Sequence, residues 1–158
     1  IAAGLRYLRH RSTACGAGSA AAADLDADGH IDLAVANSDN DTLKVFLGEG
    51  DGSFLPLASA LVGDGPALVA ASDLDRDGTV DLALPYRNAA VVGILHGRGD
   101  GTFEPQPAIP VGENPRAVVA TDLNDDGRID GQDLIYKTRR EKYNAIVEEV
   151  QRQHDRGL

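Results

Sequence analysis

The chain has 158 residues, the size of one ordinary domain, and its 25 acidic residues outnumber 15 Lys and Arg residues, giving a formal charge of −10. This balance argues against nucleic-acid backbones and anionic membrane surfaces as partners, because both select basic patches. No apolar run reaches the ~18 residues of a membrane-spanning helix, so we expect no membrane span.

The first part of the chain gives the weakest signals. Residues 1–15 align poorly with the outer strand of a preceding repeat, so we interpret them as a degenerate strand or an N-terminal extension. Residues 16–64 read as a first repeat. It contains a weak, Ala-rich opening strand (19–23), an acidic loop, two apolar strands (31–35 and 43–47) and a glycine-rich turn that leads to Phe54.

Residues 65–113 repeat the same order 49 residues later. The turn Gly97-x-Gly99-Asp100-Gly101 corresponds to Gly48-x-Gly50-Asp51-Gly52 in the first repeat. The apolar segments predict four strands, the last of which is interrupted by prolines and therefore suits a sheet edge. These strands are expected at 67–71, 80–84, 91–95 and 103–111.

A third repeat begins at residue 114 and departs from the pattern after its acidic loop, at residue 132. From residue 133 the apolar residues step by threes and fours, with charges between them, which predicts an amphipathic helix over 133–158. The sequence therefore predicts a mainly β array of 49-residue units followed by one C-terminal α-helix.

The acidic loop is the motif that carries chemistry. Its form is Asp-x-Asp-x-Asp-Gly-x-x-Asp, and the first residues of its three copies are Asp24, Asp73 and Asp122, with Asn124 replacing the second Asp of the third copy. Ca²⁺ takes about 6–8 oxygen ligands, and a glycine allows the sharp turn that wraps them around it. Three crowded carboxylates would otherwise repel one another, so the sequence predicts a calcium site in each copy.

These loops, together with the motif Leu47-Gly48-x-Gly50-Asp51-Gly52-x-Phe54, resemble the FG-GAP/VCBS repeats of calcium-binding β-propellers, which include integrin-α heads. The resemblance covers residues 16–130, and two separate motifs recur in one register. It implies a partial β-propeller built of four-stranded blades. It also implies two to three calcium ions, each in the hairpin between the first and second strands of a blade.

The resemblance also implies a ligand set for each loop. Carboxylate or amide side chains would supply most of the oxygens, and the backbone carbonyl of the seventh loop residue would supply one more. The implied ligands are Asp24, Asp26, Asp28, the His30 carbonyl and Asp32; Asp73, Asp75, Asp77, the Thr79 carbonyl and Asp81; and Asp122, Asn124, Asp126, the Arg128 carbonyl and Asp130.

An EF-hand shares the first half of this loop but needs a bidentate acid at its twelfth position. The first two copies place Val35 and Leu84 there, so neither fits. The third copy places Asp133 there and runs into the predicted helix, so it also resembles a dockerin-type calcium loop. Whether the third loop is of propeller type or of EF-hand and dockerin type stays open.

The tail has a resemblance of its own. Residues 133–150 are similar to a segment of the bacterial preprotein-translocase ATPase. A phosphate-binding Gly-x-x-x-x-Gly-Lys-Ser/Thr loop is absent from the sequence, so the ATPase activity cannot be carried over. A fusion junction, a chimeric gene or an assembly artefact would each explain this change of pattern, and the choice among them stays open.

The sequence contains no recognisable set of catalytic residues. The four histidines, His10, His30, His96 and His154, are scattered without metal-ligand spacing, and we interpret them as ordinary surface residues. We expect a non-enzymatic, calcium-binding recognition or adhesion module. The alternatives are the non-catalytic propeller part of a larger secreted hydrolase or lyase, and a dockerin-like scaffolding element.

The sequence also sets expectations about partners and location. An extracellular or cell-surface setting is expected, with an unidentified protein or carbohydrate as ligand, although residues 1–11 do not resemble a signal peptide. Two complete repeats are fewer than the 4–8 blades of closed propellers. We therefore expect the chain either to self-associate or to belong to a longer parent with further blades.

Overall fold

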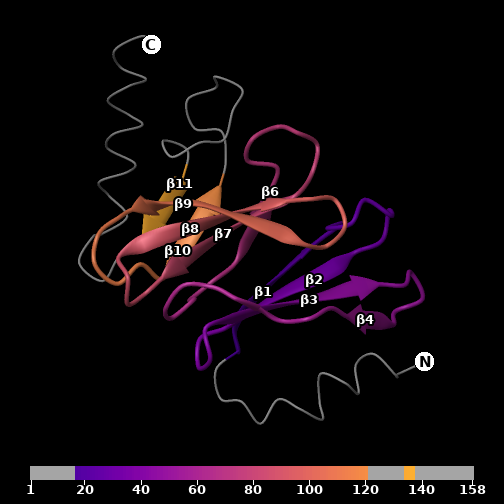
Figure 1. Ribbon diagram of the computed structural model, residues 1–158, viewed down its shortest axis with the longest axis horizontal. Helices are drawn as coiled ribbons and strands as arrows, with labels where there is room; N and C mark the ends of the chain where they lie inside the picture. Colours follow the sequence, from indigo (N-terminus) through magenta and orange to yellow (C-terminus); the bar gives the residue numbers. More distant parts are fainter. Residues whose placement is uncertain (1–16, 121–133, 138–158) are drawn as a thin grey trace.

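The computed structural model describes residues 17–120 and 134–137, and all of its regular elements in these residues are strands. The strands are β1 (Ala17–Ala23), β2 (Asp32–Asn37), β3 (Thr42–Gly48), β4 (Phe54–Pro56), β5 (Ala60–Leu61), β6 (Ala70–Ser72), β7 (Asp81–Tyr86), β8 (Val91–Gly97), β9 (Phe103–Pro110), β10 (Ala117–Ala120) and β11 (Leu134–Lys137). In Figure 1, β1 to β4 lie together in one part of the molecule, and β7 to β11 lie together in another.

The strands form three antiparallel sheets, one for each repeat. The first sheet has the order β1-β2-β3-β4, with β5 also paired to β3. The second sheet has the order β6-β7-β8-β9, and the third is the pair β10-β11. The predicted four-stranded unit is therefore confirmed for the second repeat, and the first repeat has four such strands with the short β5 in addition. In both repeats the acidic loop joins the first and second strands, as expected.

The 49-residue period is kept in the strand register. Ala22 pairs with Leu33 in the first sheet, and Ala71 pairs with Leu82 in the second. Successive side chains of a strand point to opposite faces of its sheet. Equivalent residues of the two sheets must therefore face in equivalent directions.

The core between the first two sheets pairs small side chains with large ones. Ala34 and Ala36 of β2 lie in one buried cluster with Leu82 and Leu84 of β7. Since Leu33 is equivalent to Leu82, and Ala34 to Ala83, each sheet turns its alanine face toward the next sheet and its leucine face toward the preceding one. This complementarity lets the backbones approach closely and fills the space between them.

The same arrangement recurs on the other side of the second sheet. Ala83, Val92 and Ile94 lie in a second buried cluster with Leu74 and with Val118 of β10. The second sheet is thus enclosed by the first sheet on one side and by the third on the other.

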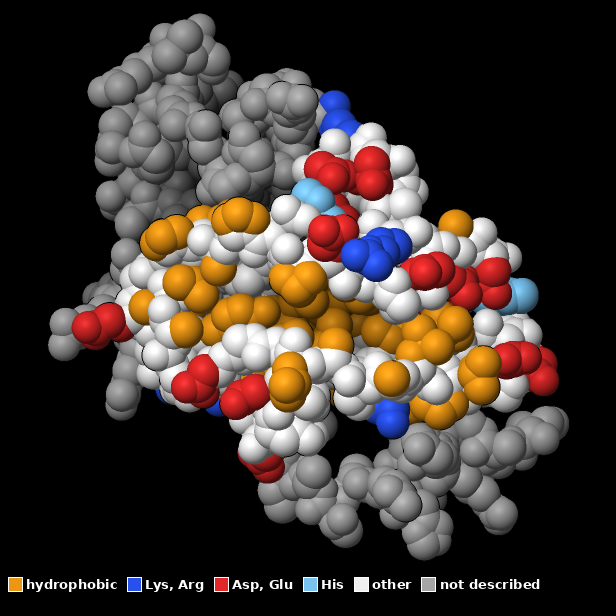
Figure 2. Space-filling view, viewed as in Figure 1, with side chains coloured by type: hydrophobic (Ala, Val, Ile, Leu, Met, Phe, Trp, Pro, Cys, Tyr) orange, Lys and Arg blue, Asp and Glu red, His pale blue; other side chains and the backbone are white. Residues whose placement is uncertain are grey.

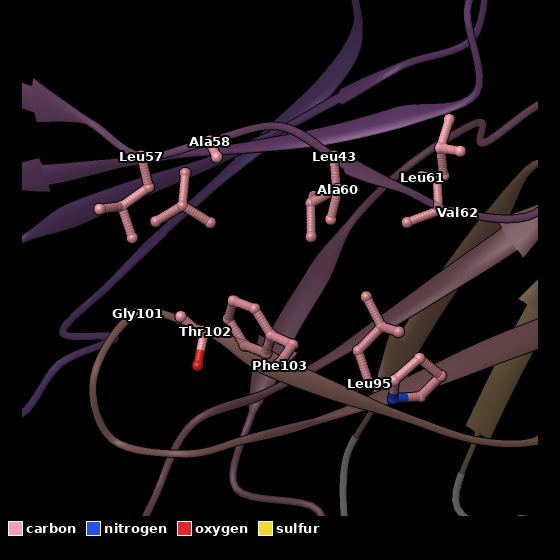
Figure 3. A pocket seen from close by; sticks show the side chains of 12 residues that line it. Leu43, Leu57, Ala58, Ala60, Leu61, Val62, Leu95, Gly101, Thr102 and Phe103 are labelled. Atoms are coloured by element: carbon pink, nitrogen blue, oxygen red, sulfur yellow. The ribbon is translucent and has the colours of Figure 1, made fainter.

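An apolar groove of about 360 Å³ runs along the outer part of the junction between the first two sheets. In Figure 3, Leu57 and Leu61 of the first repeat face Leu95 and Phe103 of the second. A band of hydrophobic side chains also crosses the face of the molecule in Figure 2. The Thr102 hydroxyl at the groove is hydrogen-bonded to Asp100. The lining therefore has the chemistry of an extended core rather than of an acid–base site.

The prediction of a helix from residue 133 is wrong for residues 134–137, which form β11. Leu134 pairs with Ala120, as Leu33 pairs with Ala22 and Leu82 with Ala71 in the other sheets. Leu134 therefore occupies the position equivalent to Leu33 and Leu82. Thirteen residues (121–133) separate that pair, whereas ten residues (23–32 and 72–81) separate its counterparts. The third repeat therefore resumes its strand pattern after three extra residues, and pairing with β10 overrides the helical periodicity.

The rest of the predicted helix (138–158), the third acidic loop and the N-terminal extension lie outside the described residues. Among the residues that the structure describes, no helix has the length and hydropathy needed to cross a membrane.

Candidate metal centre

The first and second acidic loops, residues 24–32 and 73–81, have the same backbone conformation. Gly29 and Gly78 have φ values of +89° and +91°, and an added Cβ would meet nothing within 4 Å at either position. Glycine is therefore needed at this position for its backbone conformation rather than for space. Ala27 and Arg76, two residues earlier, are also left-handed, at 61° and 64°. These left-handed residues coil the loop, as the sequence predicted.

Each loop is closed by the same three hydrogen bonds from backbone N–H groups to its aspartates. In the first loop, Gly29 N donates to Asp24 Oδ2 at 2.9 Å, Asp28 N donates to Asp26 Oδ1 at 3.2 Å, and His30 N donates to Asp28 Oδ1 at 2.7 Å. The second loop repeats these bonds from Gly78, Asp77 and Thr79 at 3.1, 3.1 and 2.7 Å. The carboxylates are thus held in place by the loop itself.

One carboxylate oxygen in each loop has no partner. Asp24 Oδ1 and Asp73 Oδ1 are buried and accept no hydrogen bond, although Oδ2 of each is bonded to a glycine N–H. A buried polar atom without a partner costs about 1–3 kcal/mol. These two oxygens lie at equivalent positions of the two loops, so each loop has the same oxygen available to a hydrogen-bond donor or a cation.

The carboxylates also lie close enough to share a cation. One oxygen from each of Asp24, Asp26 and Asp32 lies within 4.8 Å of the others, and the same holds for Asp73, Asp75 and Asp77. Two oxygens bound to one Ca²⁺ at about 2.3–2.6 Å are at most about 5.2 Å apart. The donor sets therefore fit a calcium ion, and the structure brings together six of the predicted side-chain ligands. Asp28 does not belong to the first of these groups, and Asp81 does not belong to the second.

The last aspartate of each loop has a structural function that sequence reasoning missed. Asp32 is fully buried and accepts hydrogen bonds from Leu25 N and Gly48 N, both at 2.7 Å. Asp81 does the same with Leu74 N at 2.7 Å and Gly97 N at 2.8 Å. Each of these carboxylates therefore joins the acidic loop to the glycine-rich turn that follows the third strand.

The glycines of those turns explain why the two motifs recur together. A Cβ on Gly48 would lie 2.2 Å from the Ile31 carbonyl oxygen, and a Cβ on Gly97 would lie 2.2 Å from that of Val80. Since these neighbours are backbone atoms, only glycine permits the approach. The acidic loop and the glycine-rich turn are therefore two halves of one packed unit.

The charges of the loops perturb one another. Burial raises the pKa of Asp26, the Asp28 N–H opposes that rise, and the negative charges of Asp32, Asp28 and Asp24 raise it further. Hydrogen bonds from the backbone and ring of His30 lower the pKa of Asp28. Burial raises the pKa of Asp81, opposed by the N–H groups of Gly97 and Leu74. The negative charges in the first loop therefore oppose the ionisation of Asp26.

One histidine was misjudged from the sequence. His96 Nδ1 lies 3.2 Å from Asp75 Oδ2, and His96, Asp75 and Asp81 form a third group of potential ligands within 4.8 Å. His96 is therefore not an isolated surface residue. The signal that would have found it is its position directly before Gly97, the residue that packs against the acidic loop.

The remaining predicted ligands are not tested by the structure. Asp122, Asn124, Asp126, Arg128, Asp130 and Asp133 all lie outside the described residues. The His30 and Thr79 carbonyls stay predicted ligands. Seven of the ten described candidates occur in the three groups of potential ligands: Asp24, Asp26, Asp32, Asp73, Asp75, Asp77 and Asp81.

Comparison with known proteins supports the repeat. The family model for the FG-GAP-like repeat matches residues 24–84 and 73–130, which together cover about two thirds of the chain. The matches end at residue 130, so they give the translocase-like tail no support. No curated protein matches the chain. FG-GAP-like repeats indicate a domain of the β-propeller type, and with most of its length matched, this chain belongs to the FG-GAP-like repeat family.

Proposed function

We propose that this chain is a calcium-binding, non-catalytic recognition module in which each acidic loop holds a structural Ca²⁺. The observation that carries this proposal is the buried, unpartnered oxygen of Asp24 and of Asp73. A hard dication is the partner that clustered carboxylate oxygens select. Bound there, it would neutralise charges that otherwise repel across the loop.

The proposed calcium ions brace the sheets rather than act on a substrate. In the first repeat, Asp24, Asp26 and Asp32 would bind the ion, and Asp32 is also bonded to the backbone of the glycine-rich turn. The ion would therefore stiffen the β1–β2 hairpin and its contact with the end of β3. Asp73, Asp75 and Asp77 would do the same for the β6–β7 hairpin.

The recognition role and the extracellular setting rest on the family and on calcium chemistry. Extracellular calcium modules bind the ion at about 10⁻⁴–10⁻³ M, which suits the calcium concentration outside cells. The net charge of −10 makes nucleic acid an unsuitable partner. The ligand we propose is a protein or a carbohydrate, held by loops that calcium keeps in one conformation.

Thermal unfolding with calcium and with chelator tests the proposal. At 100 times the Kd, each site should add about 2.7 kcal/mol to the free energy of unfolding. Asp24→Asn and Asp73→Asn should each remove the contribution of one site, and the double variant should remove both. Asp51→Asn and Asp100→Asn are matched controls, because these exposed aspartates lie in the glycine-rich turns outside the ligand groups.

Results of the calcium and chelator measurements can also refute the proposal. An unfolding midpoint that is the same in calcium and in chelator would exclude structural calcium sites. A calcium effect of the same size in the double variant would place calcium elsewhere in the chain.

The dockerin-like alternative is the weaker candidate. A dockerin-type loop leads into a helix, whereas residues 134–137 form β11 and pair with β10. This strand continues the repeat pattern of the first two sheets, so we propose a propeller-type role for the third loop as well.

A further inference from the structure

We propose that the second repeat carries an additional cation site, formed by Asp75, Asp81 and His96, which takes a borderline transition-metal dication of the Zn²⁺ type. One ligand atom from each of these residues lies within 4.8 Å of the other two. His96 Nδ1 and Asp75 Oδ2 are 3.2 Å apart. The site overlaps the second acidic loop through Asp75 and Asp81, and the described residues of the first repeat form no equivalent group with a histidine.

The second repeat has this group of ligands and the first does not because the side chain at one position differs. The residue equivalent to His96, 49 positions earlier, is Leu47, and its side chain packs against the apolar core between the sheets. His96 lies at the same point of β8 but is partly exposed, beside the acidic loop. An imidazole therefore replaces an isobutyl group at a position adjacent to two carboxylates.

The donor set favours a different metal from the one proposed for the loops. Ca²⁺ prefers oxygen ligands, whereas imidazole nitrogen suits Zn²⁺ and its neighbours in the first transition row. Zinc binds histidine nitrogen and carboxylate oxygen at about 2.0–2.2 Å, so two ligand atoms at adjacent corners of its tetrahedron lie about 3.4 Å apart. The Asp75–His96 pair already has nearly that spacing, at 3.2 Å. Two carboxylates and a neutral imidazole would balance the charge of the dication.

The environment of Asp81 points to a cation here rather than to a simple ion pair. Asp81 is fully buried, and hydrogen bonds from Leu74 N and Gly97 N hold its carboxylate in position. Each of its oxygens retains a second lone pair for a metal. The location therefore combines an oriented buried carboxylate with a second carboxylate, Asp75, and an accessible imidazole.

The shared Asp75 has a consequence for binding. Asp75 belongs both to the group with Asp73 and Asp77 and to the group with Asp81 and His96. Zinc-type and calcium-type ions should therefore compete in the second repeat but not in the first. This inference goes beyond the proposed calcium function, because it requires only the Asp75, Asp81 and His96 geometry.

The test uses the full chain without an affinity tag and Co²⁺ as a spectroscopic substitute for Zn²⁺. The wild-type protein should develop visible d–d absorption on Co²⁺ addition, and Zn²⁺ should displace it. His96→Leu introduces the residue of the first repeat, and His96→Gln keeps a polar side chain without the imidazole. Loss of a group that only supports a metal ligand costs about 10–100-fold in affinity, so each variant should weaken Co²⁺ and Zn²⁺ binding at least that much.

His30→Thr is the matched control. It removes the imidazole from the first acidic loop, keeps the backbone carbonyl at this position, and installs threonine, the residue at the equivalent position 79. His30 belongs to none of the groups of potential ligands, so His30→Thr should bind Co²⁺ like the wild type. Unfolding of each metal-free variant should match that of the wild type, which verifies that folding is retained.

The results separate this inference from the calcium proposal. Co²⁺ absorption that is unchanged in both His96 variants, or absent from the wild type, would overturn the inference. Calcium stabilisation that persists in His96→Leu alongside lost Co²⁺ binding would support both proposals. Calcium stabilisation without any His96-dependent metal binding would overturn only the zinc-type site. His96-dependent Co²⁺ binding without calcium stabilisation would overturn only the calcium sites.

Discussion

The first and second sheets have the same strands in the same register, yet they differ in burial. Every residue of β7 is buried, whereas buried and half-buried residues alternate along β2. Leu82 is fully buried and its equivalent Leu33 is only half-buried. The cause is the number of neighbours, because the second sheet is enclosed on both faces and the described first sheet packs another sheet against its alanine face only.

The same repeat pattern therefore contributes different amounts to the free energy of unfolding at different places in the array. Stability in repeat proteins is approximately the sum of the stabilities of single units and of their interfaces. Equivalent substitutions in the two sheets therefore isolate the contribution of the interfaces, because the local strand context is held constant.

The largest difference is expected from a matched pair of leucine truncations. Leu82→Ala removes a fully buried side chain from the junction of the two sheets and should cost about 2–5 kcal/mol. Leu33→Ala removes the equivalent, half-buried side chain and should cost clearly less. Urea unfolding of both variants measures the two losses, and equal losses would mean that enclosure of the second sheet contributes nothing.

A second pair tests the contact between the sheets at the glycine-rich turns. Gly101 N donates to the Leu25 carbonyl at 3.1 Å, and a Cβ on Gly101 would lie 2.8 Å from Leu47 Cδ2 and 3.1 Å from Leu57 Cδ1. A Cβ on the equivalent Gly52 would meet nothing within 4 Å. Both residues have positive φ, so each alanine variant is destabilised by the steric cost of a Cβ in that backbone conformation.

Gly101→Ala should therefore be the more destabilising variant, by about 1–3 kcal/mol of overpacking. The difference in unfolding free energy between Gly101→Ala and Gly52→Ala removes the shared backbone term. Similar values for the two variants would show that the sheets do not meet as closely at this turn as the structure indicates.

The smallest effect is expected on the less enclosed sheet. The Lys44 ammonium lies 5.5 Å from the centre of the Phe46 ring, an arrangement that the second sheet lacks because Gly93 and Leu95 stand at those positions. Cation–π pairs at exposed sites contribute about 0.5–1 kcal/mol. Lys44→Gln should lower the free energy of unfolding by that amount. An unchanged or higher free energy of unfolding would show that the Lys44–Phe46 contact does not stabilise the protein.

Self-association is a further test of the half-buried leucine face. The sequence predicts either association or further blades in a longer parent, and light scattering on the purified chain measures the first directly. Leu33→Gln should weaken any association that uses this face. A stable monomer whose unfolding is cooperative and unaffected by concentration would contradict the prediction of self-association.

Much of the fold was accessible from the sequence. The strict 49-residue phase predicted seven of the nine strands of the first two repeats, β1 to β3 and β6 to β9, and placed the acidic loops in the hairpins between first and second strands. This succeeded because alternating apolar residues, aspartates at alternate positions and turn glycines are all local signals. Asp24 and Asp73 were singled out by their positions in the motif alone, and the structure places each in a group of carboxylates that could hold a metal ion.

The remaining features depend on contacts between distant residues. The Asp32–Gly48 hydrogen bond joins residues 16 positions apart, and the approach of Gly48 to the Ile31 carbonyl leaves no trace in periodicity. His96 approaches Asp75 only once β8 has paired with β7. The strand β11 was mistaken for helix because pairing with β10 decides its conformation, while the sequence that follows has helical spacing.

The most direct test of the account is diffraction from crystals grown with calcium, using the anomalous signal of the ion. The account predicts one anomalous peak among Asp24, Asp26 and Asp32 and another among Asp73, Asp75 and Asp77, each within about 2.3–2.6 Å of the coordinating oxygens. The oxygens Asp24 Oδ1 and Asp73 Oδ1 should each contact an ion. Density for water alone at both places, at saturating calcium, would contradict it.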